Sequence, residues 1–231
     1  MLGLLWTMAF ASVEEDLQLA ADGDLDESAR MVAFNRLVTD HDVGWDTLVK
    51  AAGDDDWAAR ERWIAVRVIG STDDERAEAA LVELTSDPMP AIRVAAATAL
   101  ADVGATGAGD TLIDLLDDKA IIVRAAAADS LGALKERKAI DPLAEAIADS
   151  SNYHRGSSLW VRGHYVDALG DIGSRDAIPA LITCFDDTDP TVGDAALESL
   201  YAIVGYDFAE GRSRDEHMEA WRRWWKNGGR I

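Results

Sequence analysis

IRVAAATALADVG (residues 92–104) and VRAAAADSLGALK (residues 123–135) are two copies of one sequence pattern, 31 residues apart. Two further copies follow, VRGHYVDALGDIG at 161–173 and the more divergent VGDAALESLYAIV at 192–204. Aligned on Arg93, Arg124, Arg162 and Gly193, the copies are separated by 31, 38 and 31 residues, so the middle interval is one period plus seven inserted residues. A fixed period of this length indicates stacked supersecondary units.

The apolar residues of each copy indicate a helix. In the first copy they are Ile92, Ala96, Ala97, Leu100 and Val103, and the same offsets recur in the next two copies. A second apolar run follows each copy, such as LIDL at 112–115, and predicts a second, shorter helix. Each unit is therefore expected to be a helical hairpin that buries its apolar face only by stacking on its neighbours.

This pattern resembles the HEAT repeat family, in the short bacterial form named after phycobilisome lyases, over about residues 54–205. The resemblance rests on D-x5-R at Asp87/Arg93 and Asp118/Arg124, on the A-A-x-A-L run, and on A-I-P-x-L-I at 177–182. It implies an all-α fold, an α-solenoid of about five to six stacked helical hairpins with a helical cap at each end. The family includes scaffolds, adaptors and bilin lyases on one frame, so the resemblance predicts the fold more sharply than the function.

Three regions are expected along the chain. Residues 1–53 are an apolar N-terminal segment and capping helices, residues 54–208 are the repeats with an insertion near 151–158, and residues 209–231 are a Trp-rich C-terminal capping helix. In that last helix Trp221, Trp224 and Trp225 fall on one face. A ligand site is the alternative for these rings, but aromatic side chains at helical spacing usually cover core, so we interpret them as a cap.

Composition limits the partners. The chain has 43 acidic and 22 basic residues and a formal charge of −21, which disfavours nucleic acid. No run approaches the roughly 18 apolar residues of a membrane span, and we expect a monomer with a protein partner. The apolar stretch at residues 1–11 is either the remnant of an export signal or, the reading we prefer, a segment packed on the first repeat. The compartment stays open: the cytoplasm is favoured, and export follows if the first reading holds.

No set of catalytic, cofactor-binding or metal-binding residues is visible in the sequence. A phosphate-loop-like spacing at 104–111 has Asp110 where lysine is required, and an Asp-rich run at 21–27 lacks the glycine and terminal glutamate of a calcium loop. The four histidines show no H-x3-H pairing, and the single cysteine, Cys184, lies in the apolar run LITCF, which indicates a buried residue. The prediction is a protein without enzymatic activity or cofactor.

The regularly spaced arginines Arg93, Arg124 and Arg162 have two interpretations. They could form an anion-binding stripe, or each could pair with an aspartate in the turn between repeats, because an Asp stands six residues earlier in two of the units. We prefer the second interpretation. Gly156 and Gly193 interrupt the pattern in the last two units, so the ladder is expected only in the middle of the chain.

Two groups of residues are candidate contact surfaces. Aromatic, His and Arg side chains collect in and after the insertion: Tyr153, His154, Arg155, Trp160, His164 and Tyr165. Insertions in solenoids often form the binding face, and Tyr, Trp and Arg dominate binding hot spots, but the same side chains could simply pack on the neighbouring unit. We weigh these two readings evenly. The second group is an acidic ladder, Glu83, Asp114 and Glu145, which either meets a basic partner or is a solvated face.

Two functions remain. The extended repeat surface and the missing catalytic set favour a non-catalytic protein-protein interaction scaffold or adaptor. The alternative, a bilin lyase-like or chromophore-handling protein, is implied by the resemblance and by an aromatic and arginine cluster that suits an open-chain tetrapyrrole with two propionates.

Overall fold

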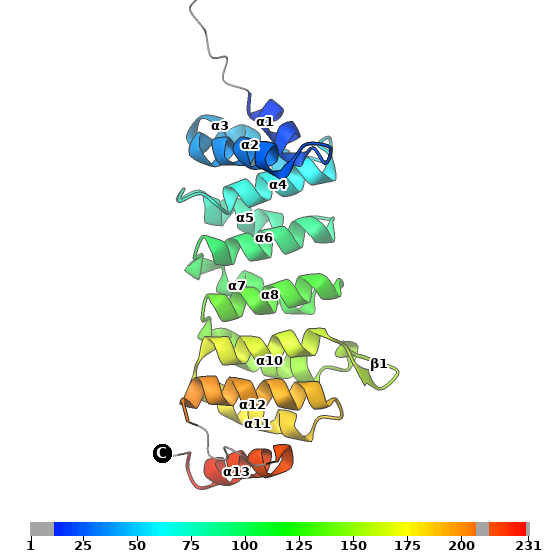
Figure 1. Cartoon of the computed structure of the whole chain (residues 1–231), viewed down its shortest axis with the longest axis vertical. Coiled ribbons are helices and arrows are strands. Elements are labelled where there is room, and N and C mark those ends of the chain that lie inside the picture. The colour runs from blue at the N-terminus through cyan, green and yellow to red at the C-terminus, as the bar shows by residue number, and fades with distance from the viewer. Residues whose placement is uncertain (1–11, 207–212, 230–231) are drawn as a thin grey trace, which may run out of the picture. The chain divides into compact units, whose positions relative to one another are not determined.

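The computed structural model describes residues 12–206 and 213–229, so the apolar stretch at 1–11 lies outside the described residues. Within those ranges the chain forms thirteen α-helices, short 3-10 turns and one small antiparallel sheet (Figure 1). Two compact units are distinguished, Met1–Val103 and Gly104–Ile231. No helix in the described ranges is both long enough and apolar enough to cross a bilayer.

The first unit contains the predicted leading helix, a helix pair before the repeats and the first repeat helices. Its elements are α1 (Val13–Ala21), α2 (Glu27–Thr39), α3 (His41–Gly53), α4 (Ala59–Ile69), α5 (Ala77–Leu84) and α6 (Pro90–Asp102). Serine and aspartate side chains cap α1 and α2, because Ser12 and Asp26 accept hydrogen bonds from the first turns. Proline occupies the first turn of α6, where it needs no hydrogen-bond acceptor.

The second unit alternates long and short helices. Its elements are α7 (Gly109–Asp114), α8 (Ile121–Ala133), α9 (Ile140–Ala148), β1 (Tyr153–His154), β2 (Ser157–Ser158), α10 (Val161–Ile172), α11 (Ile178–Thr183), α12 (Pro190–Val204) and α13 (Arg214–Lys226). Helix α8 packs on α10, and α10 packs on α12, so the long helices form one layer of this unit and the short helices another. The predicted all-α solenoid of stacked helical hairpins is confirmed.

Small residues let the long helices approach closely. A Cβ atom at Gly132 of α8 would lie 3.1 Å from the Cα of Ala168 in α10, and one at Gly170 would lie 3.1 Å from the Cα of Ser199 in α12. In the first unit, a Cβ at Gly70 would meet the main chain of Ala99 at the same distance. The alanine- and glycine-rich pattern therefore recurs because small side chains allow the backbones of successive long helices within a unit to pack closely.

Buried arginines join successive repeats by ion pairs. Arg62 of α4 donates to the carboxylate of Asp87, 25 residues later, and both side chains are buried. Arg162 of α10 forms a two-point pair with Asp187, again 25 residues later. Burial by itself would raise the pKa of Asp187, but the hydrogen bonds from Arg162 and from the Asp189 main chain, together with the Arg162 charge, hold it below its usual value. Each pair reaches from one repeat to the turn before the next long helix.

This arrangement corrects the expected pairing. The aspartate six residues before Arg93 or Arg124 offers its main-chain carbonyl oxygen, 2.8 Å from the guanidinium, while the Asp87 carboxylate accepts from Arg62 of the preceding repeat. The ladder is also not confined to the middle of the chain, because Arg62 and Arg162 belong to it. For Arg62 and Arg162 the carboxylate partner therefore lies in the adjacent repeat.

Helix α13 covers the C-terminal end of the second unit. Trp221 and Trp224 are buried and meet edge to face, with ring centroids 5.3 Å apart. Arg175 lies 5.4 Å from the Trp224 ring and donates to the carbonyl of Gly229, which ties the end of the cap to the unit. Trp225 is partly exposed, so two of the three predicted tryptophans form the buried face of the cap.

Candidate interaction surfaces

The inserted residues form a short β-hairpin rather than an irregular loop. Tyr153 pairs with Ser158 and His154 with Ser157, and the two residues between them, Arg155 and Gly156, both have positive φ. Two consecutive residues with positive φ define the type I′ turn that matches the twist of a two-residue hairpin. Glycine adopts this conformation freely, but arginine does so at a cost. The exposed tip of the hairpin thus holds Arg155 in a strained backbone position.

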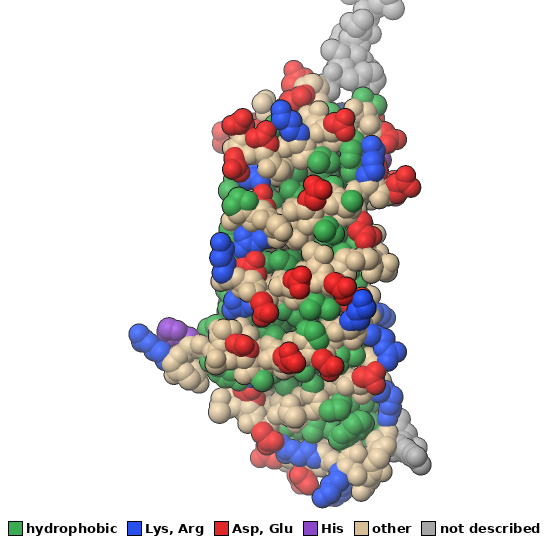
Figure 2. Space-filling model, turned by 180° about the vertical axis from the view of Figure 1, so that it is seen from behind, with side chains coloured by type: hydrophobic (Ala, Val, Ile, Leu, Met, Phe, Trp, Pro, Cys, Tyr) green, Lys and Arg blue, Asp and Glu red, His purple; other side chains and the backbone are tan. Residues whose placement is uncertain are grey.

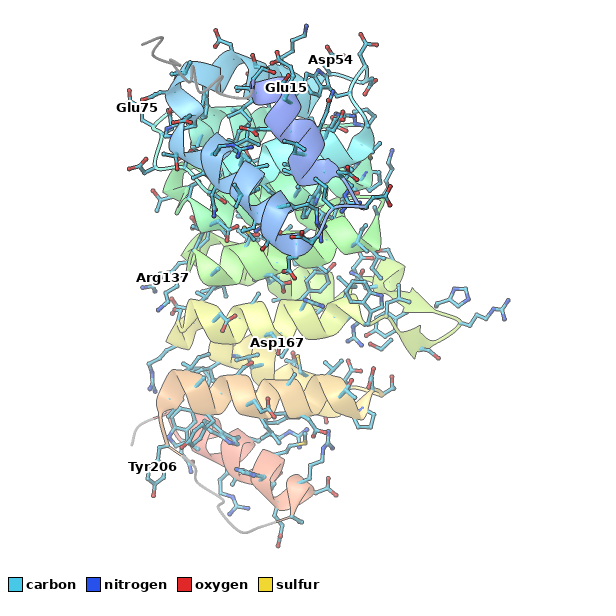
Figure 3. The ribbon with its side chains drawn as sticks, turned by 45° about the horizontal axis from the view of Figure 1, so that its top comes forward. Glu15, Asp54, Glu75, Arg137, Asp167 and Tyr206 are labelled. Atoms are coloured by element: carbon cyan, nitrogen blue, oxygen red, sulfur yellow. The ribbon has the colours of Figure 1, made fainter. Side chains whose placement is uncertain are left out.

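Arg162 anchors the hairpin to the helices. Its guanidinium lies 4.2 Å from the centre of the Tyr153 ring and 3.0 Å from the Ser158 hydroxyl oxygen, to which it donates. Its Nε donates to the carbonyl of Ile147, and Asn152 at the base of the hairpin donates to the carbonyl of Ala146. The hairpin is therefore held at its base while its tip projects from the unit (Figures 2 and 3).

Trp160 is the exposed aromatic side chain beside the hairpin. It is 53% exposed at the start of α10, and its ring meets that of His164 edge to face, with centroids 5.1 Å apart. The Nδ1 atom of His164 lies 2.7 Å from a carboxylate oxygen of Asp129 on α8, which fixes the imidazole. We name His154, Arg155, Trp160 and His164 the hairpin patch, because these side chains are exposed or half-buried in the insertion and in the first turn of α10 that follows it.

Two residues of the predicted cluster do not lie on this surface. Tyr165 is fully buried in α10, and burial raises the pKa of its hydroxyl against the smaller, opposing influence of Arg124. Tyr153 is half-buried beneath the Arg162 guanidinium, and burial raises its pKa as well. Tyr165 is therefore a core residue, and Tyr153 supports the hairpin instead of extending from it.

The acidic ladder is exposed on the short helices. Glu83 lies on α5 of the first unit, and Asp114 and Glu145 lie on α7 and α9 of the second. Within the second unit, Figure 1 draws the short helices behind the long ones, so Figure 2, seen from behind, looks onto the short helices of that unit. Acidic side chains stand between apolar ones there (Figure 2). The positions fit either reading of the ladder, a contact surface for a basic partner or a solvated face.

One group in the first unit has the composition of a metal site. His41, Asp42 and Asp74 place ligand atoms within 4.8 Å of one another. However, Arg76 already supplies a cation there: its Nε donates to Asp74 at 2.8 Å, and its guanidinium also reaches Asp42 at 3.1 Å. The hydrogen bond from Arg76 is the main cause that lowers the pKa of Asp74 to about 2. A metal ion would have to displace this guanidinium, so the group acts as an ion-pair cluster.

Cys184 lies at the end of α11 and is buried. Burial raises the pKa of its thiol to about 11, which keeps the sulfur protonated near neutral pH. A protonated, enclosed thiol is a poor nucleophile, as the apolar run around Cys184 indicates.

The stacked hairpins define a helical-repeat protein of the α-solenoid class. The family model described as HEAT repeats matches residues 45–121, 84–160 and 153–211, which together span most of the chain. The chain therefore belongs to the HEAT repeat family.

The chain is also similar to individual proteins. The phycocyanobilin lyase subunit alpha of Nostoc sp. is 36% identical over 67 residues, which are 29% of this chain and 24% of the relative, so the match spans about a quarter of that protein. A designed armadillo repeat protein in complex with the peptide (KR)4 is 18% identical, with a TM-score of 0.51 over 84% of this chain and 100% of the other. The complex of CpcE and CpcF of phycocyanin lyase from Nostoc sp. is 17% identical, with a TM-score of 0.36 over 96% and 99% of the two chains.

Proposed function

We propose that this chain is a non-catalytic scaffold or adaptor that binds a partner protein through the hairpin patch. The observation that carries the proposal is the exposure of Trp160 beside a hairpin whose base is fixed and whose tip holds Arg155 in a strained conformation. Arg and Trp are the residues that most often dominate binding energy. A strained, exposed residue on a rigid support is typical of positions kept for contact rather than for stability.

Trp160→Ala and Arg155→Ala are each expected to weaken partner binding by more than about 1 kcal/mol, which is about fivefold in Kd. The melting temperature should change little, because both side chains are exposed in the free protein. A partner captured from the source cell by the tagged wild-type chain, then titrated against each variant, gives the affinities. Differential scanning calorimetry gives the melting temperatures.

Tyr201→Ala is the matched control, since Tyr201 on α12 is also 53% exposed but lies outside the patch. It should retain wild-type binding. A large drop in melting temperature for Trp160→Ala with unchanged binding would instead assign Trp160 to packing. In that case the acidic ladder becomes the preferred surface, with a basic partner whose affinity falls as salt is added.

A second function, bilin handling, is favoured by one observation, the similarity over 67 residues to the protein named phycocyanobilin lyase subunit alpha. The two functions differ in an absorbance measurement. When the chain is mixed with free phycocyanobilin, the scaffold proposal expects the visible band of the pigment to stay unchanged. A shifted band that Arg155→Ala abolishes would favour bilin handling, because an arginine suits the propionates.

A further inference from the structure

A groove in the first unit leaves large apolar side chains uncovered. It lies between α2 and α4, encloses about 260 Å³, and is lined chiefly by Arg30, Met31, Phe34, Trp63, Ile64 and Arg67. Met31 is 50% exposed and Trp63 is 40% exposed. Exposed apolar side chains gathered at a concave place, unlike scattered ones, mark a site of contact.

Arginines border this groove although the protein is strongly acidic. Arg30 and Arg67 line it, and Arg60 stands one turn before Trp63 and Ile64 on α4. The Arg67 guanidinium lies 5.7 Å from the centre of the Trp63 ring. Across residues 12–206 and 213–229, none of these three arginines forms an ion pair with a carboxylate, although Glu27 also lies at the groove. With 43 acidic residues in the chain, unpaired arginines at one groove are a local reversal of charge.

One of these arginines has a hydrogen-bond donor left over. The Nε atom of Arg30 is buried and has no acceptor, while the residue as a whole is half-buried. A buried donor without an acceptor is costly and is rare in native proteins. A carboxylate entering the groove would pair with the guanidinium charge of Arg30, which lines it.

We propose that this groove binds a segment of a partner protein in which a large apolar side chain stands next to one or more carboxylates. The apolar side chain would lie against Met31 and Trp63, and the carboxylates would meet Arg30 and Arg67. The volume is below the roughly 300–1,000 Å³ of most small-molecule sites, which suits one or two side chains of a peptide. This groove belongs to the first unit and the hairpin patch to the second, so separate variants test the two surfaces.

Peptide selection on the full-length chain tests the proposal without knowledge of the natural partner. A random nine-residue library displayed on phage is selected against the immobilised protein, and enriched peptides are synthesised with a fluorescent label for anisotropy titration. We expect peptides that place Leu, Phe or Trp beside Asp or Glu. Their affinity should fall steeply between about 50 and 300 mM NaCl, because surface charge pairs are screened by salt.

Variants then locate the binding. Arg30→Gln with Arg67→Gln should weaken the selected peptide by about tenfold or more, since both charged contacts are lost. Arg137→Gln with Lys138→Gln removes the same charge from exposed positions in the second unit and should leave affinity unchanged, as should Trp160→Ala. Replacing the acidic residues of the peptide by their amides removes the same charged contacts without altering the protein. The affinity of the peptide should again fall by about tenfold.

The proposal is overturned by a selection that yields no peptides above background, by enriched peptides without acidic residues, or by equal binding of the protein with both glutamine substitutions in the groove. Loss of binding in Trp160→Ala alone would assign the selected peptides to the hairpin patch, and would likewise count against the groove.

Discussion

Replacement of Arg62 by methionine is expected to lower the free energy of unfolding by about 3–5 kcal/mol. The guanidinium is buried and donates to the carboxylates of Asp87 and Asp55 and to the carbonyl of Ala52. Methionine retains much of the apolar volume but leaves the Asp87 carboxylate buried without its cation, which is why the loss is large. Native domains are stable by only roughly 5–15 kcal/mol. Urea unfolding followed by circular dichroism at neutral pH measures the change.

A second substitution separates two causes of the stability loss, the unpaired Asp87 carboxylate and the altered packing around residue 62. Asp87→Asn combined with Arg62→Met removes the unpaired carboxylate, so the double variant should recover part of the stability. Arg137→Met is the matched control, because Arg137 pairs with Asp176 at 2.6 Å but both side chains are largely exposed. Its loss should stay below about 1 kcal/mol. Similar losses at Arg62 and Arg137 would show that burial of the inter-repeat pair does not stabilise the stack.

The repeat pattern predicted the helices but not the partners of the arginines. Apolar offsets within one copy report which side of a helix is buried, and α6, α8 and α10 form where those offsets occur. The ion pairs between repeats join residues 25 positions apart. Pairing each arginine with the aspartate of its own turn could not reveal them. Arg62 was also missed, although it stands 31 residues before Arg93, because the alanine run that marks the other copies is absent around it.

The candidate surfaces were predicted only in part. The insertion was found because it breaks the period, and Trp160 is exposed there. The sequence did not show that Tyr165 is buried while the adjacent His164 is half-buried, because this depends on how α10 packs against α8. The groove of the first unit was not predicted. Helix α2 has no counterpart among the repeats, so no comparison between copies shows that Met31 and Trp63 lack cover.

The end of the second unit shows how a cap replaces a missing repeat. Gly193 stands where the other copies have arginine, and a Cβ atom there would lie 2.8 Å from the guanidinium of Arg214 in α13. Arg214 donates to the carbonyl of Pro190 at 2.9 Å and pairs with Asp194. The arginine of the last repeat is thus supplied by the capping helix, and glycine leaves space for it.

Trp221→Ala is expected to cost about 3–5 kcal/mol of stability. The side chain is 1% exposed and its ring contacts that of Trp224, so truncation opens a cavity between α13 and the helices it covers. Since stability in repeat proteins is transmitted between neighbours, α13 and α12 should lose amide-exchange protection first. Hydrogen exchange and thermal unfolding together measure this.

Trp225→Ala on the same helix is the control for that substitution. Trp225 is partly exposed, so the same chemical change should cost much less. The difference between the two variants isolates burial, because helix, residue type and distance from the chain end are nearly the same. If Trp221→Ala unfolds at the wild-type temperature, or if the two variants lose equal stability, α13 does not act as a cap, and its aromatic face becomes a candidate contact surface instead.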